Sequence, residues 1–205
     1  MKKAELIAPH TGIPSFYKAP VVDIDKVQKG DAVIAGVPMD HGIVLTRTGT
    51  RYGPRAIREA SLFYRAVQEG ASEKTSVNVQ TKKAQRLKER IKLVDVGDIP
   101  IYPQDIKQTS ESITEDVSFL VKNETLPVLL GGDHYITYPA FEGLCKGFSE
   151  LKNNAKIGHI HIDSHTDFRD SYAGLGKFNH GTSVRRLSEN PMIEYKNIAL
   201  SLIHI

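Results

Sequence analysis

Short apolar runs alternate with amphipathic stretches along the chain, and this alternation limits the possible folds more than any other feature of the sequence. The apolar runs have the length of buried strands, and the stretches between them repeat at helical spacing. Strands that alternate with helices are typical of an α/β fold with a mainly parallel sheet, so we predict such a fold. The predicted strands are residues 32–37, 91–96, 126–130, 156–162 and 197–205.

Three stretches have apolar residues at the spacing of a helix. The first covers residues 53–67, and Pro54 stands where a first-turn proline belongs. Its apolar positions are 56, 57, 60, 63, 64 and 67. The other two stretches contain Ile106, Ile113, Val117 and Leu120, and then Phe141, Leu144 and Phe148. Residues 68–90 are polar, and we expect a loop and a surface helix there, with the basic run 82–90 facing solvent.

The composition suits one globular domain and excludes several classes of protein. A length of 205 residues is enough to bury a sizeable core, and a net charge of +3 is too small to indicate a nucleic-acid partner. The single cysteine, Cys145, excludes an internal disulfide and suits a reducing compartment. No apolar run could span a membrane, and Glu5 and Pro9 interrupt any signal peptide. We therefore expect a cytoplasmic protein with no membrane partner.

The carboxyl end of the sequence has an unusual form. The last residues, IALSLIHI, are an apolar run with no turn, helix or polar tail behind it. A domain seldom finishes on a bare buried strand. We therefore expect residues 1–205 to form a single incomplete domain that is cut short at its carboxyl end.

Polar clusters follow three of the predicted strands. DVGD (95–98) ends one strand, GGDHY (131–135) follows another, and DSHTD (163–167) follows a third. In a parallel α/β sheet, ligands bind at the carboxyl ends of the strands. The clusters are therefore candidates for a functional site, although glycine and aspartate also form ordinary turns there.

The DSHTD cluster places Asp163, His165 and Asp167 at every second position. In a continued strand the outer two would lie roughly 13 Å apart, too far for one metal ion. If the three are metal ligands, the chain must curl directly after Asp163. Mixed carboxylate and imidazole ligands suit Mn²⁺ better than structural zinc. A polar turn with helix-capping aspartates is the alternative interpretation.

Four other histidines allow more than one role. His134, after a glycine pair, is either a loop residue or a ligand. His159 and His161 lie inside a strand that we expect to be buried on both faces, so we interpret them either as core histidines or as histidines that hold metal ligands in place, in both cases with hydrogen-bonded nitrogens. His180 is either a proton carrier or a loop residue.

Taken together, these motifs resemble those of the ureohydrolase family of arginases, agmatinases and their relatives. They follow the family's order over nearly the whole chain: GVPMD (36–40), GTRYGPRAIR (49–58), DVGD, LLGGDHYIT (129–137), HIDSHTDFRD (161–170) and HGTSVRR (180–186). The resemblance implies a three-layer α/β/α fold and a site with two Mn²⁺ ions. It also implies hydrolysis of a small guanidino compound to urea and an amine, and a homo-oligomer for the full-length parent.

The resemblance further implies a role for each motif residue. His134, Asp163 and Asp167 would be ligands of one ion, and a bridging Asp163 would bind the other ion together with His165. His180 would carry protons during catalysis. The family's second D-x-D metal motif and a later glutamate do not occur in these residues. We therefore expect residues 1–205 alone to be inactive.

The residues around the predicted ligands favour an agmatinase-like enzyme, which converts agmatine to putrescine and urea. Asp170 and the HGT-x-x-RR pattern resemble agmatinases, and the asparagine and serine that hold the substrate's carboxylate in arginases are absent. Guanidinobutyrate and arginine remain alternative substrates. A single-zinc deacetylase and a non-catalytic scaffold homologue are alternative classes. Asp167 and the GGDH motif count against the deacetylase, and the intact first-half ligands count against the scaffold.

Overall fold

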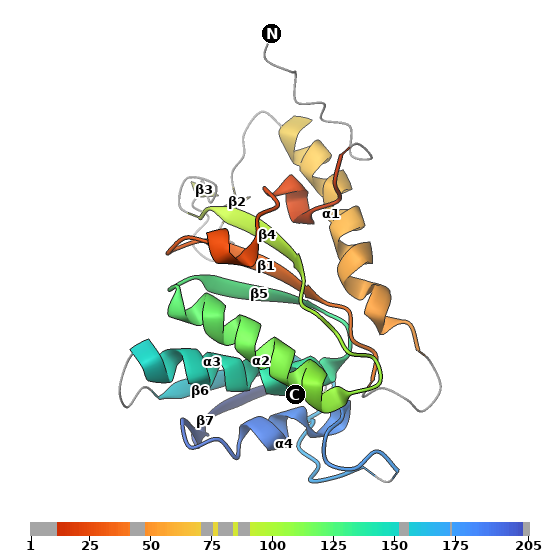
Figure 1. Ribbon diagram of the computed structural model, residues 1–205, viewed down its shortest axis with the longest axis vertical. Helices are drawn as coiled ribbons and strands as arrows, with labels where there is room; N and C mark the ends of the chain where they lie inside the picture. The colour runs from red at the N-terminus through yellow and green to blue at the C-terminus, as the bar shows by residue number, and fades with distance from the viewer. Residues whose placement is uncertain are drawn as a thin grey trace.

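A three-stranded parallel sheet forms one half of the structure (Figure 1). The computed structural model describes residues 12–41, 48–70, 76–77, 84–85, 91–151, 156–172 and 174–202, without the side chains of residues 64–70, 76–77 and 84–85. The strand order is β4-β1-β5, and both outer strands pair with β1 in parallel. The bounds are β1 Ala32–Val37, β4 Leu93–Asp98 and β5 Leu126–Gly131.

A second parallel pair forms the other half, with β6 (Ile157–Asp163) beside β7 (Ile193–Leu202). The predicted α/β fold with parallel strands is confirmed. β7 begins four residues before its predicted start, and the predicted residues 203–205 lie outside the described residues.

The described part of residues 68–90 does not contain the expected surface helix. Residues 68–70 continue the first helix. A two-residue strand, β3 (Ala84–Gln85), pairs antiparallel with β2 (Ser76–Val77), so the prediction of a helix is wrong at residues 84 and 85. Cross-strand hydrogen bonds to β2 satisfy the backbone there, and a basic composition alone could not predict that pairing.

Helices cover both faces of the β4-β1-β5 sheet. Successive residues of a strand point to opposite faces. On β1, Ala35 and Val37 pack with Ile113 and Val117 of α2 (Ile106–Lys122). The intervening Gly36 lies against the guanidinium group of Arg58 on α1 (Gly53–Gly70). The order of layers is therefore α1, sheet, α2, as the resemblance implied.

The helix α1 was predicted correctly, but its buried face was not. The described part of the predicted apolar stripe, Ala56, Ile57, Ala60 and Phe63, is exposed, whereas Pro54, Arg58, Ser61 and Leu62 are buried. Arg58 is buried because two carboxylates of β4 bind its guanidinium group. Its Nε and Nη2 donate to Asp95 at 2.9 Å each, and its Nη1 donates to Asp98 at 2.5 Å. Paired charges of this kind can be buried where single charges cannot.

The helices α2 and α3 (Thr137–Leu151) join the two halves of the structure. α2 packs on β1, whereas Phe141 and Cys145 of α3 form a core cluster with Ile157 of β6 and Ile193 of β7. The short helix α4 (Ser183–Leu187) contributes Leu187 to the same cluster. Figure 1 shows α2 and α3 side by side. Within the described residues, no helix is both long and apolar enough to cross a membrane.

Two glycines of α3 allow this close contact between the helices. A Cβ atom at Gly143 would lie 2.6 Å from the carbonyl oxygen of Thr114 and 2.8 Å from Cβ of Val117. A Cβ atom at Gly147 would lie 2.6 Å from Cβ of Val121. Such distances are too short for any real side chain, so glycine is required for the helices to approach this closely.

We predict that Gly143→Ala destabilises the protein. Overpacking of a well-packed contact costs about 1–3 kcal/mol, while alanine regains up to about 1 kcal/mol of helix propensity. Urea unfolding followed by circular dichroism should show a lower midpoint. Gly158→Ala is a matched control, because a Cβ atom there meets its nearest neighbour at 3.4 Å. Equal midpoints for the two variants would contradict the proposed role of the glycine contact.

Candidate metal centre

The end of β5 places His134 through a glycine and a capping aspartate. Gly132 has a positive φ of 80°, and a Cβ atom there would lie 2.2 Å from the carbonyl oxygen of Val37, so only glycine fits. Asp133 is fully buried, and its carboxylate accepts a hydrogen bond from the Tyr135 amide at 2.9 Å. This cap starts the short 3-10 helix η5 (His134–Ile136). The GGDH motif therefore fixes the position of His134.

The chain curls directly after β6, as a metal site requires. Asp163 is the last residue of the strand, and its Oδ1 accepts a hydrogen bond from the His165 amide at 2.9 Å. Asp167 has a positive φ of 44°, a conformation that aspartate adopts more readily than most residues. The carbonyl oxygen of Asp167 accepts from the amides of Val184 and Arg185, which anchors the turn to α4. Asp163 and Asp167 therefore do not lie roughly 13 Å apart, as they would in a continued strand.

Three of the predicted ligands converge at these two strand ends. Nδ1 of His134 lies 2.8 Å from Oδ2 of Asp167 and 3.5 Å from Oδ2 of Asp163. Two ligand atoms that bind one ion at right angles, each about 2.0–2.2 Å from it, lie roughly 3 Å apart. The separations in the structure are therefore close to those of atoms that share an ion. His134 reaches this point from β5, and both aspartates reach it from β6.

His161 joins this group, next to the predicted ligands. One potential ligand atom from each of His134, His161, Asp163 and Asp167 lies within 4.8 Å of the others. His161 is buried, its ring stacks on that of His134 at 5.4 Å, and its Nε2 donates to the carbonyl oxygen of His165 at 3.0 Å. Because that nitrogen is engaged, His161 supports the turn. The alternation along β6, which puts His159, His161 and Asp163 on one face, was the signal for it.

His165 lies at the rim of the cluster. Its side chain is 80% exposed, and its Nδ1 lies 3.6 Å from Oδ1 of Asp163. His165 therefore faces the outer oxygen of Asp163, whereas His134 faces the inner one. The resemblance implies that Asp163 and His165 together bind a second ion. The ligand role of His165 stays a prediction.

The expectation for the strand around His159 and His161 needs two corrections. β6 is not buried on both faces, because Ile160 is 75% exposed and Ile162 is 81% exposed. In addition, Nε2 of His159 is buried and has no hydrogen-bond partner among the described residues. Burial lowers the pKa of His159, and the neighbouring His161 lowers it further, so a neutral ring occupies this place.

His180 begins the 3-10 helix η6 (His180–Thr182), directly before α4. Asn179 caps η6 through a reciprocal pair of hydrogen bonds with Thr182. Oγ of Ser183 lies 3.3 Å from the carbonyl oxygens of both His134 and His180, where η6 contacts η5. The ring of His180 lies 6.1 Å from that of Tyr172. The HGTS segment is thus attached to the backbone of a predicted ligand.

The electrostatics of the cluster favour charged carboxylates. The hydrogen bond to Asp167 raises the pKa of His134 above its ordinary value, against the opposing effect of burial. Burial alone would raise the pKa of Asp163, but the backbone hydrogen bond from His165 and the nearby His134 outweigh it and lower that pKa. Ionised carboxylates and imidazole nitrogens are a donor set that Mn²⁺ accepts. The residues present therefore fit a divalent metal ion.

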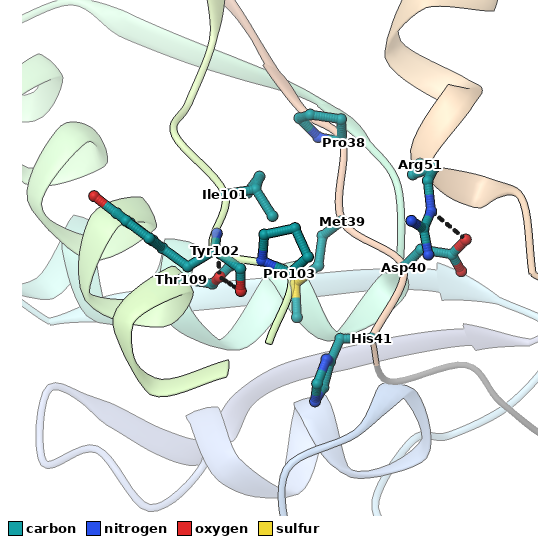
Figure 2. A pocket seen from close by; sticks show the side chains of 9 residues that line it. All are labelled: Pro38, Met39, Asp40, His41, Arg51, Ile101, Tyr102, Pro103 and Thr109. Atoms are coloured by element: carbon teal, nitrogen blue, oxygen red, sulfur yellow. Dashed lines mark hydrogen bonds and ion pairs between the residues drawn. The ribbon is translucent and has the colours of Figure 1, made fainter. Parts of the chain in front are cut away.

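The turn after β1 contains Asp40, which stabilises the turn and is not part of the metal cluster (Figure 2). The buried carboxylate of Asp40 accepts hydrogen bonds from the Gly49 amide at 2.6 Å and from Arg51 Nε at 3.0 Å. Burial would raise the pKa of Asp40, yet these hydrogen bonds lower it overall. The cavity beside it has a volume of only about 40 Å³. In Figure 2, His41 points away from Asp40 and Arg51.

Comparison with known sequences shows the family. A profile of the Arginase family matches residues 30–203, and the chain therefore belongs to the arginase family. It is 33% identical over 166 residues to a guanidinobutyrase from Pseudomonas aeruginosa, covering 80% of this chain and 45% of that protein. It is 33% identical over 162 residues to an agmatinase from Bacillus cereus, covering 79% of this chain and 49% of that protein.

Solved structures show the same fold. The chain superposes on a hypothetical agmatinase from Burkholderia thailandensis with a TM-score of 0.72 and 25% identity, covering 94% of this chain and 55% of that one. For the proclavaminate amidino hydrolase of Streptomyces clavuligerus the TM-score is 0.71 at 25% identity, covering 94% and 57%. The chain spans about half the length of the curated relatives it matches.

We predict that the protein binds Mn²⁺ through this cluster. His134→Ala and Asp167→Asn should each weaken binding at least about tenfold, which corresponds to 1.4 kcal/mol. Calorimetric titration with MnCl₂ measures this directly. His41→Ala and Asp25→Asn are matched controls at exposed positions outside the cluster. Unchanged affinity in both cluster variants would remove His134 and Asp167 from the ligand set.

Proposed function

We propose that the chain supplies half of the metal site of a manganese-dependent hydrolase that releases urea from a small guanidino compound. The convergence of His134 with Asp163 and Asp167 at two strand ends carries this proposal. Membership of the arginase family supports the reaction class, because relatives named agmatinase and guanidinobutyrase act on such compounds. The curated relatives are about twice as long, so the proposal concerns the whole protein.

Different residues of the chain would have different roles in the reaction. His134, Asp163 and Asp167 would hold one metal ion, and Asp163 with His165 would hold a second. Bound metal ions supply an activated water at neutral pH and stabilise negative charge that develops on the substrate. His180 would carry a proton to the departing amine, since η6 lies beside η5, which holds His134. His161 would keep the turn after β6 in place through the His165 carbonyl.

We propose agmatine as the preferred substrate, which would give putrescine, a precursor of polyamines. Asp170 supports an agmatinase-like site, because its carboxylate accepts from Nη2 of Arg186 at 2.7 Å and so orders the segment between the predicted ligands and the RR pair. Guanidinobutyrate is the second candidate. Relatives named guanidinobutyrase, guanidinopropionase and guanidino acid hydrolase match at 29–33% identity, as closely as agmatinases do.

The proposal also covers the compartment and the oligomeric state of the protein. Cys145 is buried and unpaired, which suits a reducing compartment such as the cytoplasm. Burial raises the pKa of the Cys145 thiol to about 12, so this cysteine stays protonated and unreactive. We propose a homo-oligomer that acts on a small guanidino compound.

A comparison of substrates tests the proposal. The protein expressed from its complete reading frame and loaded with Mn²⁺ should release urea from agmatine faster than from arginine, with guanidinobutyrate as the third substrate. Residues 1–205 alone should release none, because two Mn²⁺ ions carry +4 and Asp163 with Asp167 supply only −2. A preference for arginine would overturn the substrate, and no urea from any guanidino compound would favour a non-catalytic scaffold.

A second prediction concerns His180. Replacement by alanine in the complete protein should lower kcat by about 10²–10⁴-fold, the usual contribution of a positioned proton carrier. The Mn²⁺ content, measured by atomic absorption, should stay the same, because His180 is not a ligand. His41→Ala is the control. If kcat is unchanged, His180 is an ordinary loop residue.

A further inference from the structure

A pocket of about 260 Å³ lies between the amino-terminal halves of α2 and α3. This volume is slightly below the range of about 300–1,000 Å³ that is usual for ligand pockets, so it suits a small molecule. None of the residues that line it belongs to the proposed metal ligands. The pocket therefore needs its own explanation.

Aromatic rings form one wall of the pocket. Phe178 is 48% exposed, although its ring stacks on Tyr138 at 5.9 Å and meets the edge of Tyr135 at 6.5 Å. The faces of aromatic rings carry partial negative charge and attract cations. The wall offers an apolar surface that also favours positive charge.

The hydroxyl groups of Ser110, Thr114 and Tyr135 in the pocket already have partners. The hydroxyl groups of Ser110 and Tyr135 lie 3.0 Å apart, and Ser110 Oγ also lies 2.7 Å from the carbonyl oxygen of Ile106. Thr114 donates to the carbonyl oxygen of Pro139 at 3.0 Å. The polar groups left to meet a ligand are therefore the carboxylates, Lys107 and the hydroxyl of Tyr138.

Three glutamates and one lysine line the pocket, so its lining carries net negative charge. Glu111 lies 3.8 Å from Lys107, and Glu115 pairs with Lys146 at 2.5 Å. Glu142 differs from both, because it has no ion-pair partner among the described residues. Its Oε1 accepts one hydrogen bond, from Nδ2 of Asn190 at 3.0 Å.

The surroundings of Glu142 do not cancel its charge. Burial raises the pKa of Tyr138, and the negative charge of Glu142 raises it further. The nearby guanidinium group of Arg186 opposes this effect. Arg186 is itself neutralised, since its Nη2 lies 2.7 Å from Asp170 and 3.2 Å from Glu189. A half-buried carboxylate beside aromatic rings thus remains without a cation.

We propose that this pocket binds a small organic cation, an alkylammonium or alkylguanidinium ion, at a site separate from the metal centre. The alkyl part would lie on Tyr138 and Phe178, and the charged head would bind the carboxylate of Glu142. Amphipathic cations satisfy both surfaces at once, whereas anions would be repelled by the glutamates and neutral alcohols would leave the charge of Glu142 uncompensated. The inference stands on the pocket and does not require the proposed hydrolase activity.

Calorimetric titration of the purified protein with n-butylammonium chloride tests the proposal. Glu142→Gln and Phe178→Leu should each weaken binding roughly three- to tenfold, by loss of the charge and of the ring face. Glu150→Gln is the matched control, because it makes the same change on the same helix outside the pocket. The isosteric 1-butanol should bind at least roughly tenfold more weakly than n-butylammonium.

A variant of the metal centre separates the two sites. Asp163→Asn should leave n-butylammonium binding unchanged, because Asp163 does not line the pocket. Loss of binding in Asp163→Asn with full binding in Glu142→Gln would place the cation at the metal centre and overturn the proposal. Equal affinity in Glu142→Gln, Phe178→Leu and the unchanged protein would also overturn it, as would equal affinity for 1-butanol.

Discussion

The packing of α3 links the two strand ends that carry the metal cluster, because α3 follows His134 directly and packs on β6 and β7, while its contact with α2 ties it to the larger sheet. Within the described residues, β5 and β6 belong to different sheets, and no strand pairing connects them. His134 comes from the end of β5, whereas Asp163 and Asp167 come from the end of β6. The glycine contact at Gly143 and Gly147 holds the helices that pack on these two sheets. His134 and Asp167 lie 2.8 Å apart across the two sheets.

Much of the fold could be predicted because its strands are short apolar runs. The predicted bounds of β1, residues 32–37, are the observed ones, because the strand is a continuous run of buried apolar residues. The orientation of α1 could not be predicted in the same way. A count of apolar positions placed Ile57 and Phe63 in the core, but Arg58 occupies the buried face because Asp95 and Asp98 bind it. That pairing joins residues about 40 positions apart, beyond the reach of helical periodicity.

The sequence motifs indicated which residues form the candidate site, but they indicated only in part how these residues are arranged. The spacing of Asp163 and Asp167 indicated metal ligands only if the chain curled, and the positive φ of Asp167 provides that turn. The outward position of His165 and the inward position of His161 follow from the pleat of β6 and from hydrogen bonds to the turn. Ile160 and Ile162 read as core residues in the sequence, yet both are exposed. Their environment depends on the layers around β6, which a single apolar run does not specify.

The central claim is that His134, Asp163 and Asp167 bind the same metal ion. The most direct measurement is a crystal structure of the Mn²⁺-loaded protein with anomalous data collected near the manganese edge. We expect an anomalous peak about 2.0–2.2 Å from Nδ1 of His134 and from a carboxylate oxygen of each aspartate. A well-ordered site without such a peak, or a peak bound by other residues, would contradict the account.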